Sequence, residues 1–305
     1  MFTRICRKND MKKSQDEIFV QIPSYRDDQL IYTIQSLLNN AHDSTRLNIS
    51  ICWQHEELEM LPKEILELKN INIIDIDYRE SKGANWARSI VQKNWKNEPY
   101  TLLIDSHIRF SKKWDIKLIN MLLELQNSGV SKPILTGYPP PFEPESFPKN
   151  RSNYPLKMYV EGYYYNLLTK FNGQSIPHFK WIKSPLKAYF IALGFLFTKG
   201  IFNLEIPFDP DIYFYGDEIT TGLRAYCHGY DFFHPHRVIA WHLYDRKTRT
   251  PHWENHNNWH ILDAKSCQRI KEIFKGVEYK GFPLGRMRSV SDYEEFIGHK
   301  LIENE

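Results

Sequence analysis

The sequence lacks the features that mark several large classes of protein. Its 40 Lys and Arg residues nearly balance 37 Asp and Glu, and no dense basic block occurs, so nucleic acid is not an expected partner. No apolar run reaches the ~18 residues that a membrane span needs. The first 16 residues are polar and carry no apolar stretch typical of a secretory signal. These absences predict a cytoplasmic protein without a membrane span.

Cysteine is scarce as well. The four cysteines stand far apart in the chain: Cys6, Cys52, Cys227 and Cys267. Such spacing is typical neither of a disulfide framework nor of a cysteine-ligated zinc site, so we expect reduced thiols.

Four common catalytic motifs are also missing. The sequence contains no Walker A segment, no Gly-x-Gly-x-x-Gly, no Gly-x-Ser-x-Gly and no His-Glu-x-x-His. Kinase, dinucleotide oxidoreductase, serine hydrolase and zincin functions therefore lose their usual support.

Strand and helix patterns alternate over the first 137 residues. Apolar runs predict strands at 17–22, 47–53, 71–76 and 100–104, and a 3.6-residue period predicts helices from residue 27 onward and at 58–68, 83–91 and 114–125. This order predicts an α/β fold with a mostly parallel sheet flanked by helices. Ligands of such sheets bind beyond the carboxyl ends of the strands, where Ser24-Tyr25-Arg26 and Asp105-Ser106-His107 fall.

The second half of the chain has a different character. Residues 138–155 hold six prolines, and a loop of this length is usually functional. We expect strands at 159–165, 188–198 and 238–244, and helices at 216–229 and 256–274. No second hydrophobic core is evident, so this half is expected to elaborate the same sheet. The expected division is a polar extension at 1–16, one domain at 17–275 with halves 17–137 and 138–275, and a C-terminal extension at 276–305.

Asp105-Ser106-His107 is the sharpest local feature. In an extended backbone, residues two apart point to the same side, so the carboxylate and the imidazole would face the same way. Such a pair suits a divalent metal with mixed oxygen and nitrogen ligands, such as Mn²⁺. The alternative is a capping aspartate followed by a surface histidine.

Two helix starts carry further candidates. Gly83 opens a helix on which Arg88 could approach a phosphate; the alternative is that Arg88 is an ordinary exposed arginine on this helix. Gly216 precedes the acid pair Asp217-Glu218. The pair is explained equally by capping and by a role in binding sugar hydroxyls or as a base.

His242 is a candidate third ligand only because Asp105 and His107 need one. Spacing does not single it out, since the same half contains His228, His234, His236, His252, His256 and His260. A histidine-rich zinc site therefore stays open. Arg246 follows closely and could neutralise a diphosphate.

Taken in order, these segments resemble a GT-A nucleotide-sugar glycosyltransferase. Residues 18–27 (IFVQIPSYRD) resemble its first nucleotide-binding strand, and residues 83–88 its Gly-x-x-x-Ala-Arg helix. Asp105-Ser106-His107 resembles its Asp-x-His metal motif, and residues 192–197 (ALGFLF) its glycine strand under the donor sugar. The acidic turn at 216–218 and His242 are similar to its acceptor-side motif and late metal histidine. The segments IPSYRD, DSHIRF and YGDE are most similar to the cytoplasmic hydroxyproline N-acetylglucosaminyltransferases that modify a ubiquitin-ligase adaptor, a family with bacterial and viral relatives. This similarity covers about residues 18–246.

The resemblance implies a retaining transfer from UDP-N-acetylglucosamine that depends on Mn²⁺ or a similar ion such as Mg²⁺. It implies a metal held by Asp105, His107 and His242, and a sugar and acceptor oriented by Asp217 and Glu218. The donor site that it implies consists of Pro23, Ser24, Tyr25, Arg26, Arg88, Asp105, Ser106, Gly194 and Arg246. A protein or glycan acceptor would meet residues 138–165 or 248–259. Two alternatives remain: an inverting transferase with Asp217 or Glu218 as base, and a non-catalytic module that binds glycans or nucleotides.

Overall fold

The computed structural model describes residues 15–165, 167–246 and 249–302. Cys6 and most of the expected extension at 1–16 lie outside the described residues, as do residue 247, residue 248 of the expected acceptor segment and residues 303–305 at the C-terminus.

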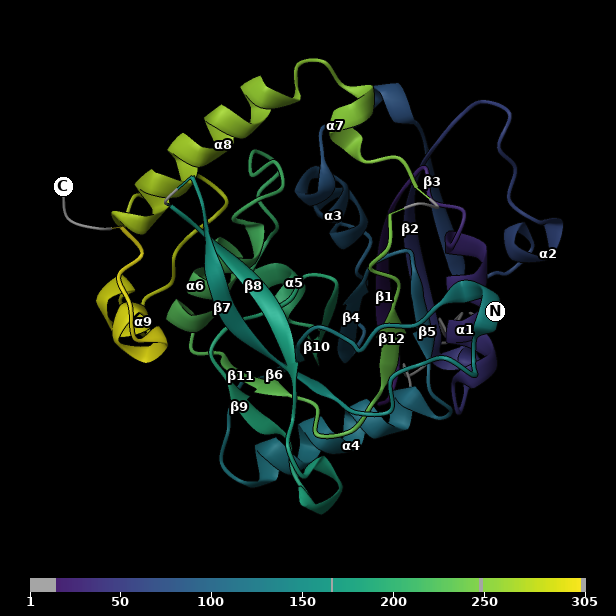
Figure 1. The fold of residues 1–305 in the computed structure, drawn as a ribbon, viewed down its shortest axis with the longest axis horizontal. Helices are drawn as coiled ribbons and strands as arrows, with labels where there is room; N and C mark the ends of the chain where they lie inside the picture. Colours follow the sequence, from purple (N-terminus) through teal and green to yellow (C-terminus); the bar gives the residue numbers. More distant parts are fainter. Residues whose placement is uncertain (1–14, 166, 247–248, 303–305) are drawn as a thin grey trace, which may run out of the picture.

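A mixed sheet of eight strands runs through the molecule in the order β3-β2-β1-β4-β10-β6-β11-β9 (Figure 1). The four strands β3, β2, β1 and β4 are parallel, whereas β10 is antiparallel to both of its neighbours. The expected α/β fold with a mainly parallel sheet is thus confirmed. The strand bounds are β1 Ile18–Tyr25, β2 Leu47–His55, β3 Ile71–Asp77, β4 Tyr100–Ile104, β6 Pro133–Thr136, β9 Leu186–Ala188, β10 Phe195–Lys199 and β11 Asp231–His234.

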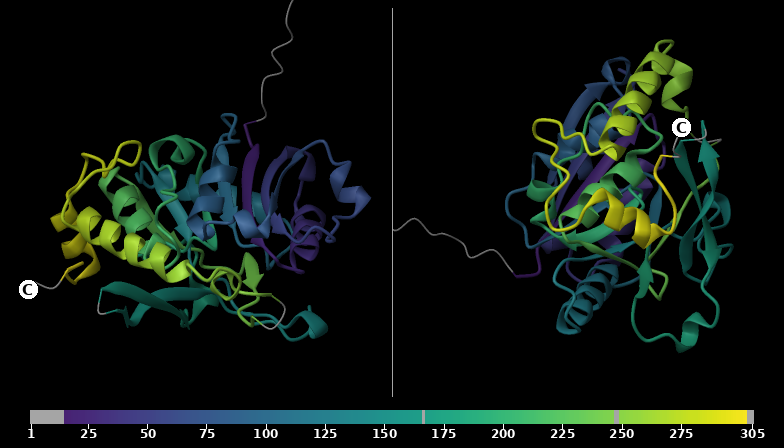
Figure 2. Two further views of the ribbon diagram at one scale, coloured as in Figure 1. Left: turned by 90° about the horizontal axis from the view of Figure 1, so that it is seen from above. Right: turned by 90° about the vertical axis from the view of Figure 1, so that its left-hand side faces the viewer.

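The described part of the chain also forms two smaller sheets. One pairs β5 Ile108–Phe110 with β12 Ala240–His242, and the other pairs β7 Leu156–Tyr164 with β8 Leu168–Ser175. The β7–β8 pair forms a layer of its own beside the main sheet (Figure 2).

Helices cover both faces of the large sheet. Their bounds are α1 Leu30–Asn40, α2 Lys63–Leu66, α3 Ala84–Gln92, α4 Trp114–Asn127, α5 Phe202–Glu205, α6 Asp217–Cys227, α7 His252–Asn255, α8 Trp259–Phe274 and α9 Val290–Ile297. Short 3₁₀ turns lie at η1 Ser44–Arg46, η2 Tyr78–Glu80, η3 Pro144–Ser146 and η4 Phe179–Trp181. Among the described residues, no helix has both the length and the apolar character of a membrane span.

Successive side chains of β4 point to opposite faces of the sheet, which explains why helices cover both faces. Leu102 and Ile104 face the core shared with α1 and α4, whereas Leu103 faces the core shared with α5, α6 and α8. Burial of both strand faces accounts for the uninterrupted apolar run at 100–104. A second hydrophobic core therefore exists, contrary to expectation, because the sheet separates two apolar layers. The strands of the second half do join the same sheet, as expected.

The first strand runs further than its sequence predicts. It continues through Pro23 to Tyr25, pairing with β2 along its whole length, but its pairing with β4 stops at Gln21. Proline cannot donate a ladder hydrogen bond, so it is tolerated where a strand has lost one neighbour. Pro23 thus marks the point where β1 emerges into the site.

Other predicted elements are shorter than expected. Residues 189–194 of the predicted strand 188–198 do not form a strand, because side chains bind their main chain in place of a neighbouring strand. Ala192 N donates to Thr136 Oγ1 at 2.8 Å, and Leu193 N donates to Glu218 Oε1 at 3.0 Å. The predicted helix 58–68 reduces to α2, which begins after Pro62. The strand predicted at 238–244 reduces to β12, and the helix predicted at 256–274 starts at Trp259.

The C-terminal segment packs against the rest of the chain. Tyr293 of α9 is fully buried in the same core as Leu223 of α6 and Ile270 of α8. The described cysteines, Cys52, Cys227 and Cys267, are all free thiols.

Candidate active site

A cavity of about 820 Å³ opens beyond the carboxyl ends of β1 and β4. Because these strands are parallel, the residues that follow them meet at one edge of the sheet. Asp105 and Ser106 follow β4 directly, and Tyr25 ends β1. The expected site residues that line this cavity are Pro23, Tyr25, Arg88, Asp105, Ser106, His107, Gly194, Asp217, Glu218, His242 and Arg246.

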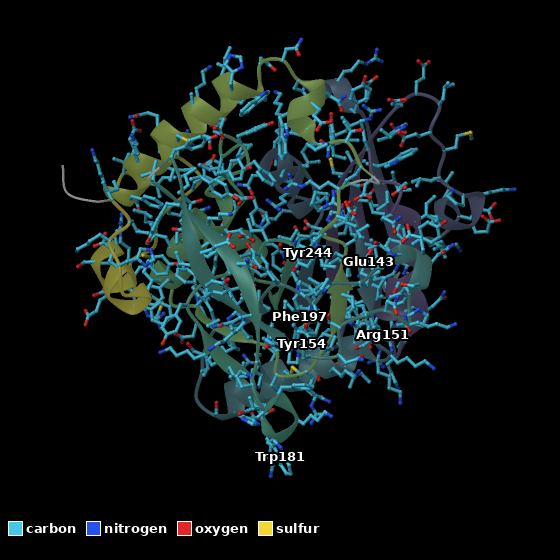
Figure 3. The ribbon with its side chains drawn as sticks, in the orientation of Figure 1. Glu143, Arg151, Tyr154, Trp181, Phe197 and Tyr244 are labelled. Atoms are coloured by element: carbon cyan, nitrogen blue, oxygen red, sulfur yellow. The ribbon has the colours of Figure 1, made fainter. Side chains whose placement is uncertain are left out.

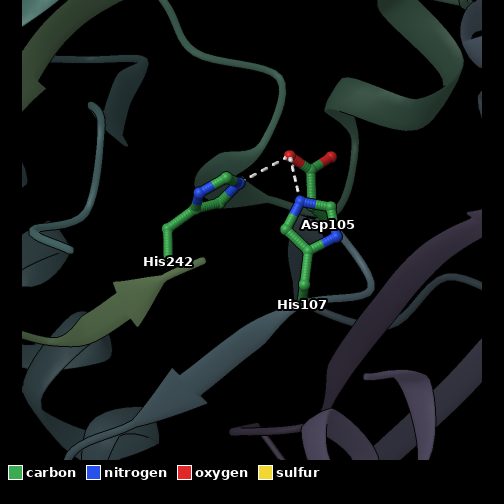
Figure 4. A group of neighbouring side chains, drawn as sticks. All are labelled: Asp105, His107 and His242. Atoms are coloured by element: carbon green, nitrogen blue, oxygen red, sulfur yellow. Dashed lines mark hydrogen bonds and ion pairs between the residues drawn. The ribbon is translucent and has the colours of Figure 1, made fainter. Parts of the chain in front are cut away.

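Asp105, His107 and His242 form a cluster with the donor set of a divalent metal site. One ligand atom from each lies within 4.8 Å of the others, and among the described residues no other group of three or more potential ligands does so. The Nε2 atoms of His242 and His107 lie 3.1 Å and 3.8 Å from Asp105 Oδ2. Figure 4 shows both imidazoles turned toward this carboxylate oxygen. One oxygen and two nitrogen donors suit Mn²⁺ and related ions.

Asp27 fixes the orientation of His107. Its Oδ2 accepts hydrogen bonds from His107 Nδ1 at 2.6 Å and from Ser106 Oγ at 2.5 Å, while its Oδ1 accepts from Gln29 N at 3.0 Å. Burial opposes ionisation of this carboxyl, but these hydrogen bonds and the nearby imidazole hold the pKa of Asp27 below its usual range. With Nδ1 engaged as a donor, His107 presents the lone pair of Nε2 to the cluster, as metal-ligating histidines do.

His242 reaches the cluster through the short β5–β12 sheet. Its register places His242 opposite Ile108, and Leu243 N donates to His107 O at 3.1 Å. On the other side, His242 N donates to Pro140 O at 3.0 Å, so part of the proline-rich segment supports the strand. Burial and the neighbouring His107 lower the pKa of His242 to about 4, which leaves the imidazole neutral at physiological pH.

Gly194 lies against the carboxylate of Asp105. Its carbonyl accepts from Asp105 N at 3.2 Å, and a Cβ at this position would lie 2.6 Å from Asp105 Oδ2. Only glycine leaves this carboxylate in place.

Arg88 links the cluster of Asp105, His107 and His242 to the acid pair on α6. Its side chain is 7% exposed, Nη1 donates to Asp217 Oδ2 at 2.5 Å, and Nη2 lies 3.9 Å from Asp105 Oδ1. Burial raises the pKa of Asp217, although the charge and hydrogen bond of Arg88 oppose the rise. Gly83 precedes this helix with φ 110°, and a Cβ there would clash with Tyr213.

Both carboxylate oxygens of Glu218 are already engaged. Tyr138 Oη donates to Oε2 at 2.8 Å and Leu193 N to Oε1 at 3.0 Å. Burial and the adjacent Asp217 raise the pKa of Glu218 to about 8, against the effect of these hydrogen bonds. Near neutral pH this side chain is therefore largely a neutral acid.

Two expected donor-site residues do not line the main cavity. Ser24 is 2% exposed and lies beneath the surface of the sheet edge. Arg26 turns away, pairs with Glu56 and donates to Asn255 Oδ1 at 2.9 Å. It lines an adjoining hollow together with Arg246, whose guanidinium stacks over Trp253.

Several residues at this site make contacts that the sequence does not predict. Asp27 accepts a hydrogen bond from His107, and Tyr138 donates one to Glu218. Arg249 lines the cavity, and its main chain forms an isolated β-bridge with Asp27. His252 donates to or accepts from Tyr213 Oη at 2.7 Å. Asp27 carried one usable signal: an acid two residues after the end of a parallel strand. Of the labelled aromatic residues in Figure 3, Tyr154 and Tyr244 lie near the centre and line the cavity, whereas Trp181 projects at the lower edge.

The fold is that of the GT-A glycosyltransferases. A structure of GalNAc-T7 with UDP, GalNAc and Mn²⁺ superimposes with a TM-score of 0.56 and 13% identity, over 93% of this chain and 55% of that chain. A structure of S. aureus TarS residues 1–349 in complex with UDP-GlcNAc superimposes with a TM-score of 0.54 and 11% identity, over 92% and 70%. The chain thus spans about half the length of the GalNAc-T7 chain.

At the level of sequence, a model of the family described as Glycosyltransferase (GlcNAc) matches residues 17–67 and 58–302. The chain belongs to this glycosyltransferase family. No curated protein matches it.

Proposed function

We propose that the protein is a metal-dependent, retaining glycosyltransferase that moves N-acetylglucosamine from UDP-N-acetylglucosamine to a hydroxyl group of a protein or glycan. The observation that carries the proposal is the cluster of Asp105, His107 and His242, which shares one cavity with the acid pair on α6. Family membership supports the transfer of N-acetylglucosamine, and the UDP in the GalNAc-T7 structure and the UDP-GlcNAc in the TarS structure support the donor class.

The donor site would be assembled at the sheet edge. Tyr25, Gln54 and Ser81 line the end of the cavity beside β1 and β2, where we place the uridine. An Mn²⁺ or Mg²⁺ ion bound by the cluster would offset the negative charge that builds on the departing diphosphate. Arg246 and Arg249 line the same cavity and can add positive charge there.

The state of the two acids supports retention over inversion. An inverting transferase needs a carboxylate free to take the acceptor proton. Asp217 is instead tied to Arg88, and Glu218 accepts two hydrogen bonds while its pKa is raised to about 8. We propose that both residues position the sugar and acceptor. NMR identification of the product anomer tests this assignment, and a β-linked product from UDP-α-N-acetylglucosamine would refute it.

Organisation and location are parts of the same proposal. We propose one catalytic domain at 17–275, with a nucleotide-binding half and an acceptor-side half, followed by an extension that supports α6 through Tyr293. We also propose a cytoplasmic location, which the free thiols support, and the hydroxyproline-specific branch of the resemblance. Cell fractionation tests the location.

UDP release from a panel of UDP-sugars, with Mn²⁺ and with EDTA, tests the proposed function without an acceptor. We expect Mn²⁺-dependent release from UDP-N-acetylglucosamine, lost in Asp105→Asn and kept in Asp28→Asn, whose carboxylate is exposed and outside the cluster. Release from UDP-glucose or UDP-galactose alone would refute the donor assignment. If no UDP is released and calorimetry detects no binding of UDP with Mn²⁺, the transferase proposal fails and a binding module remains.

A further inference from the structure

The β7–β8 pair forms one wall of the active-site cavity. Six residues of β8 line it: Thr169, Lys170, Phe171, Asn172, Gly173 and Ser175. From β7, only Leu156 and Tyr164, at its two ends, do so. Successive residues of a strand point to opposite faces, so a lining made of nearly every residue is the mark of a strand that borders the cavity with its edge.

The register shows which main-chain groups point outward from that edge. Met158 N donates to His234 Nε2 at 3.2 Å, away from β8, so the pair Met158↔Gly173 is of the non-hydrogen-bonded kind. Because pair types alternate along an antiparallel ladder, Phe171, Gly173 and Ser175 direct their N–H and C=O groups away from β7. Among the described residues, the one partner found for these groups is the Asn172 side chain, whose Oδ1 accepts from Gly173 N at 2.7 Å.

The edge also leads to the acid pair. Leu168, at the start of β8, would lie 3.2 Å from a Cβ on Gly216, directly before Asp217. Further along, the Cβ of Tyr138 lies 3.7 Å from the corresponding position on Gly173, and its hydroxyl donates to Glu218. A chain lying along β8 would therefore run beside the groups that orient the reacting centre.

We propose that the acceptor is a polypeptide segment in an extended conformation that adds as a third strand to the free edge of β8. The inference rests on the proposed transferase function and names its acceptor class. Outward main-chain groups on every second residue, about 6.8 Å apart, match the repeat of another extended main chain, whereas a glycan offers no such repeat. The free groups span residues 171–175, enough for about five acceptor residues. Phe214, Tyr215 and Trp253 line the same cavity and can hold the side chains that face it.

Backbone methylation of an acceptor peptide tests the strand pairing. The probes are a library of twelve-residue peptides with one central Ser, Thr or 4-hydroxyproline, and the glycans chitobiose and N-acetyllactosamine; transfer is followed by mass. We expect transfer to a peptide. N-methylation at alternate residues of that peptide should raise KM about tenfold, with small effects at the residues between, because a strand pairs through every second N–H.

A protein variant provides the reciprocal test. Ser175→Pro removes an outward N–H without removing a bond to β7, so we expect the peptide KM to rise about three- to tenfold. Tyr163→Ala, on the half-exposed outer face of β7 and away from the cavity, is the matched control. If Ser175→Pro does not fold, the methylation scan on the unchanged protein decides.

Three results would overturn the proposal: transfer to glycans alone, no transfer to any probe while UDP-sugar hydrolysis continues, or methylation effects without alternation. Failure of the underlying function looks different, since no UDP-sugar would then be hydrolysed with Mn²⁺.

Discussion

Replacing Asp27 with Asn probes how the proposed metal site is held. Asp27 accepts three hydrogen bonds, two at Oδ2 from His107 and Ser106 and one at Oδ1 from Gln29 N. An amide has a single acceptor oxygen, so Asn must lose either the hydrogen bonds from His107 and Ser106 or the hydrogen bond from Gln29 N. Losing one hydrogen bond to a buried charged group costs about 1.5–3 kcal/mol. That loss corresponds to a ~10–100-fold weaker metal site, which is the range seen when the outer partner of a ligating histidine is removed.

The assay is an Mn²⁺ titration of UDP release from UDP-N-acetylglucosamine by the wild-type protein, Asp27→Asn and Asp28→Asn. We expect the Mn²⁺ concentration for half-maximal release to rise ~10–100-fold in Asp27→Asn, with turnover at saturating Mn²⁺ much less affected. Asp28 is exposed and bonds to the Gln29 side chain instead of to His107, so its variant should titrate like the wild type. An unchanged Mn²⁺ midpoint in Asp27→Asn would refute the role assigned to its contact with His107.

Three further changes test the geometry of the site. Gly194→Ala places a Cβ 2.6 Å from Asp105 Oδ2, so we expect Mn²⁺-dependent UDP release to fall ~100-fold while Tm stays almost unchanged. The control Gly162→Ala, whose Cβ would have no atom within 4 Å, should keep wild-type activity. Equal activities of the two variants would contradict the proposed crowding at Gly194. Burial raises the pKa of Glu218 from 4.5 to about 8, so the protonated side chain binds its proton more tightly in the folded state. The resulting contribution to the free energy of unfolding is complete below pH 4.5 and is lost as the pH rises through 8. Glu218→Gln should therefore gain ~2–3 kcal/mol relative to wild type between pH 6 and 9 in chemical denaturation, and parallel pH curves would refute the shift. Arg88→Lys keeps the charge but cannot reach both Asp217 and Asp105, so kcat should fall at least ~10-fold, and wild-type kcat would show that the bridge is dispensable.

The sequence predicted those parts of the site that depend on local pattern. The apolar run at 100–104 predicts a buried strand, and the strand's end predicts where Asp105 and His107 lie. Gly83 similarly marks the start of α3 and thereby the position of Arg88. In each case the spacing along one strand or one helix determines the geometry, so no distant contact has to be known.

Residues positioned by contacts between distant segments escaped prediction. Nothing near Tyr138 in the sequence indicates Glu218, because the two meet through a hydrogen bond between segments 80 residues apart, the proline-rich segment and the first turn of α6. Residues 189–194 have the apolar composition of a strand, but their main chain bonds to the side chains of Thr136 and Glu218. Composition sets the propensity for a strand, whereas a ladder partner decides whether the strand forms.

The β5–β12 sheet shows why His242 could be singled out among the histidines as the proposed third metal ligand only by resemblance. Each of its strands has three residues, too few for a periodic signal, and they lie 130 positions apart in sequence. Yet the register of this short pair determines that His242 faces Asp105. A shift of one residue would turn its side chain to the opposite face and bring Trp241 or Leu243 into its place. The bonds from His242 N to Pro140 O and from Leu243 N to His107 O hold the strand from both sides, so the loop at 138–142 supports the proposed metal site without contributing a ligand to it.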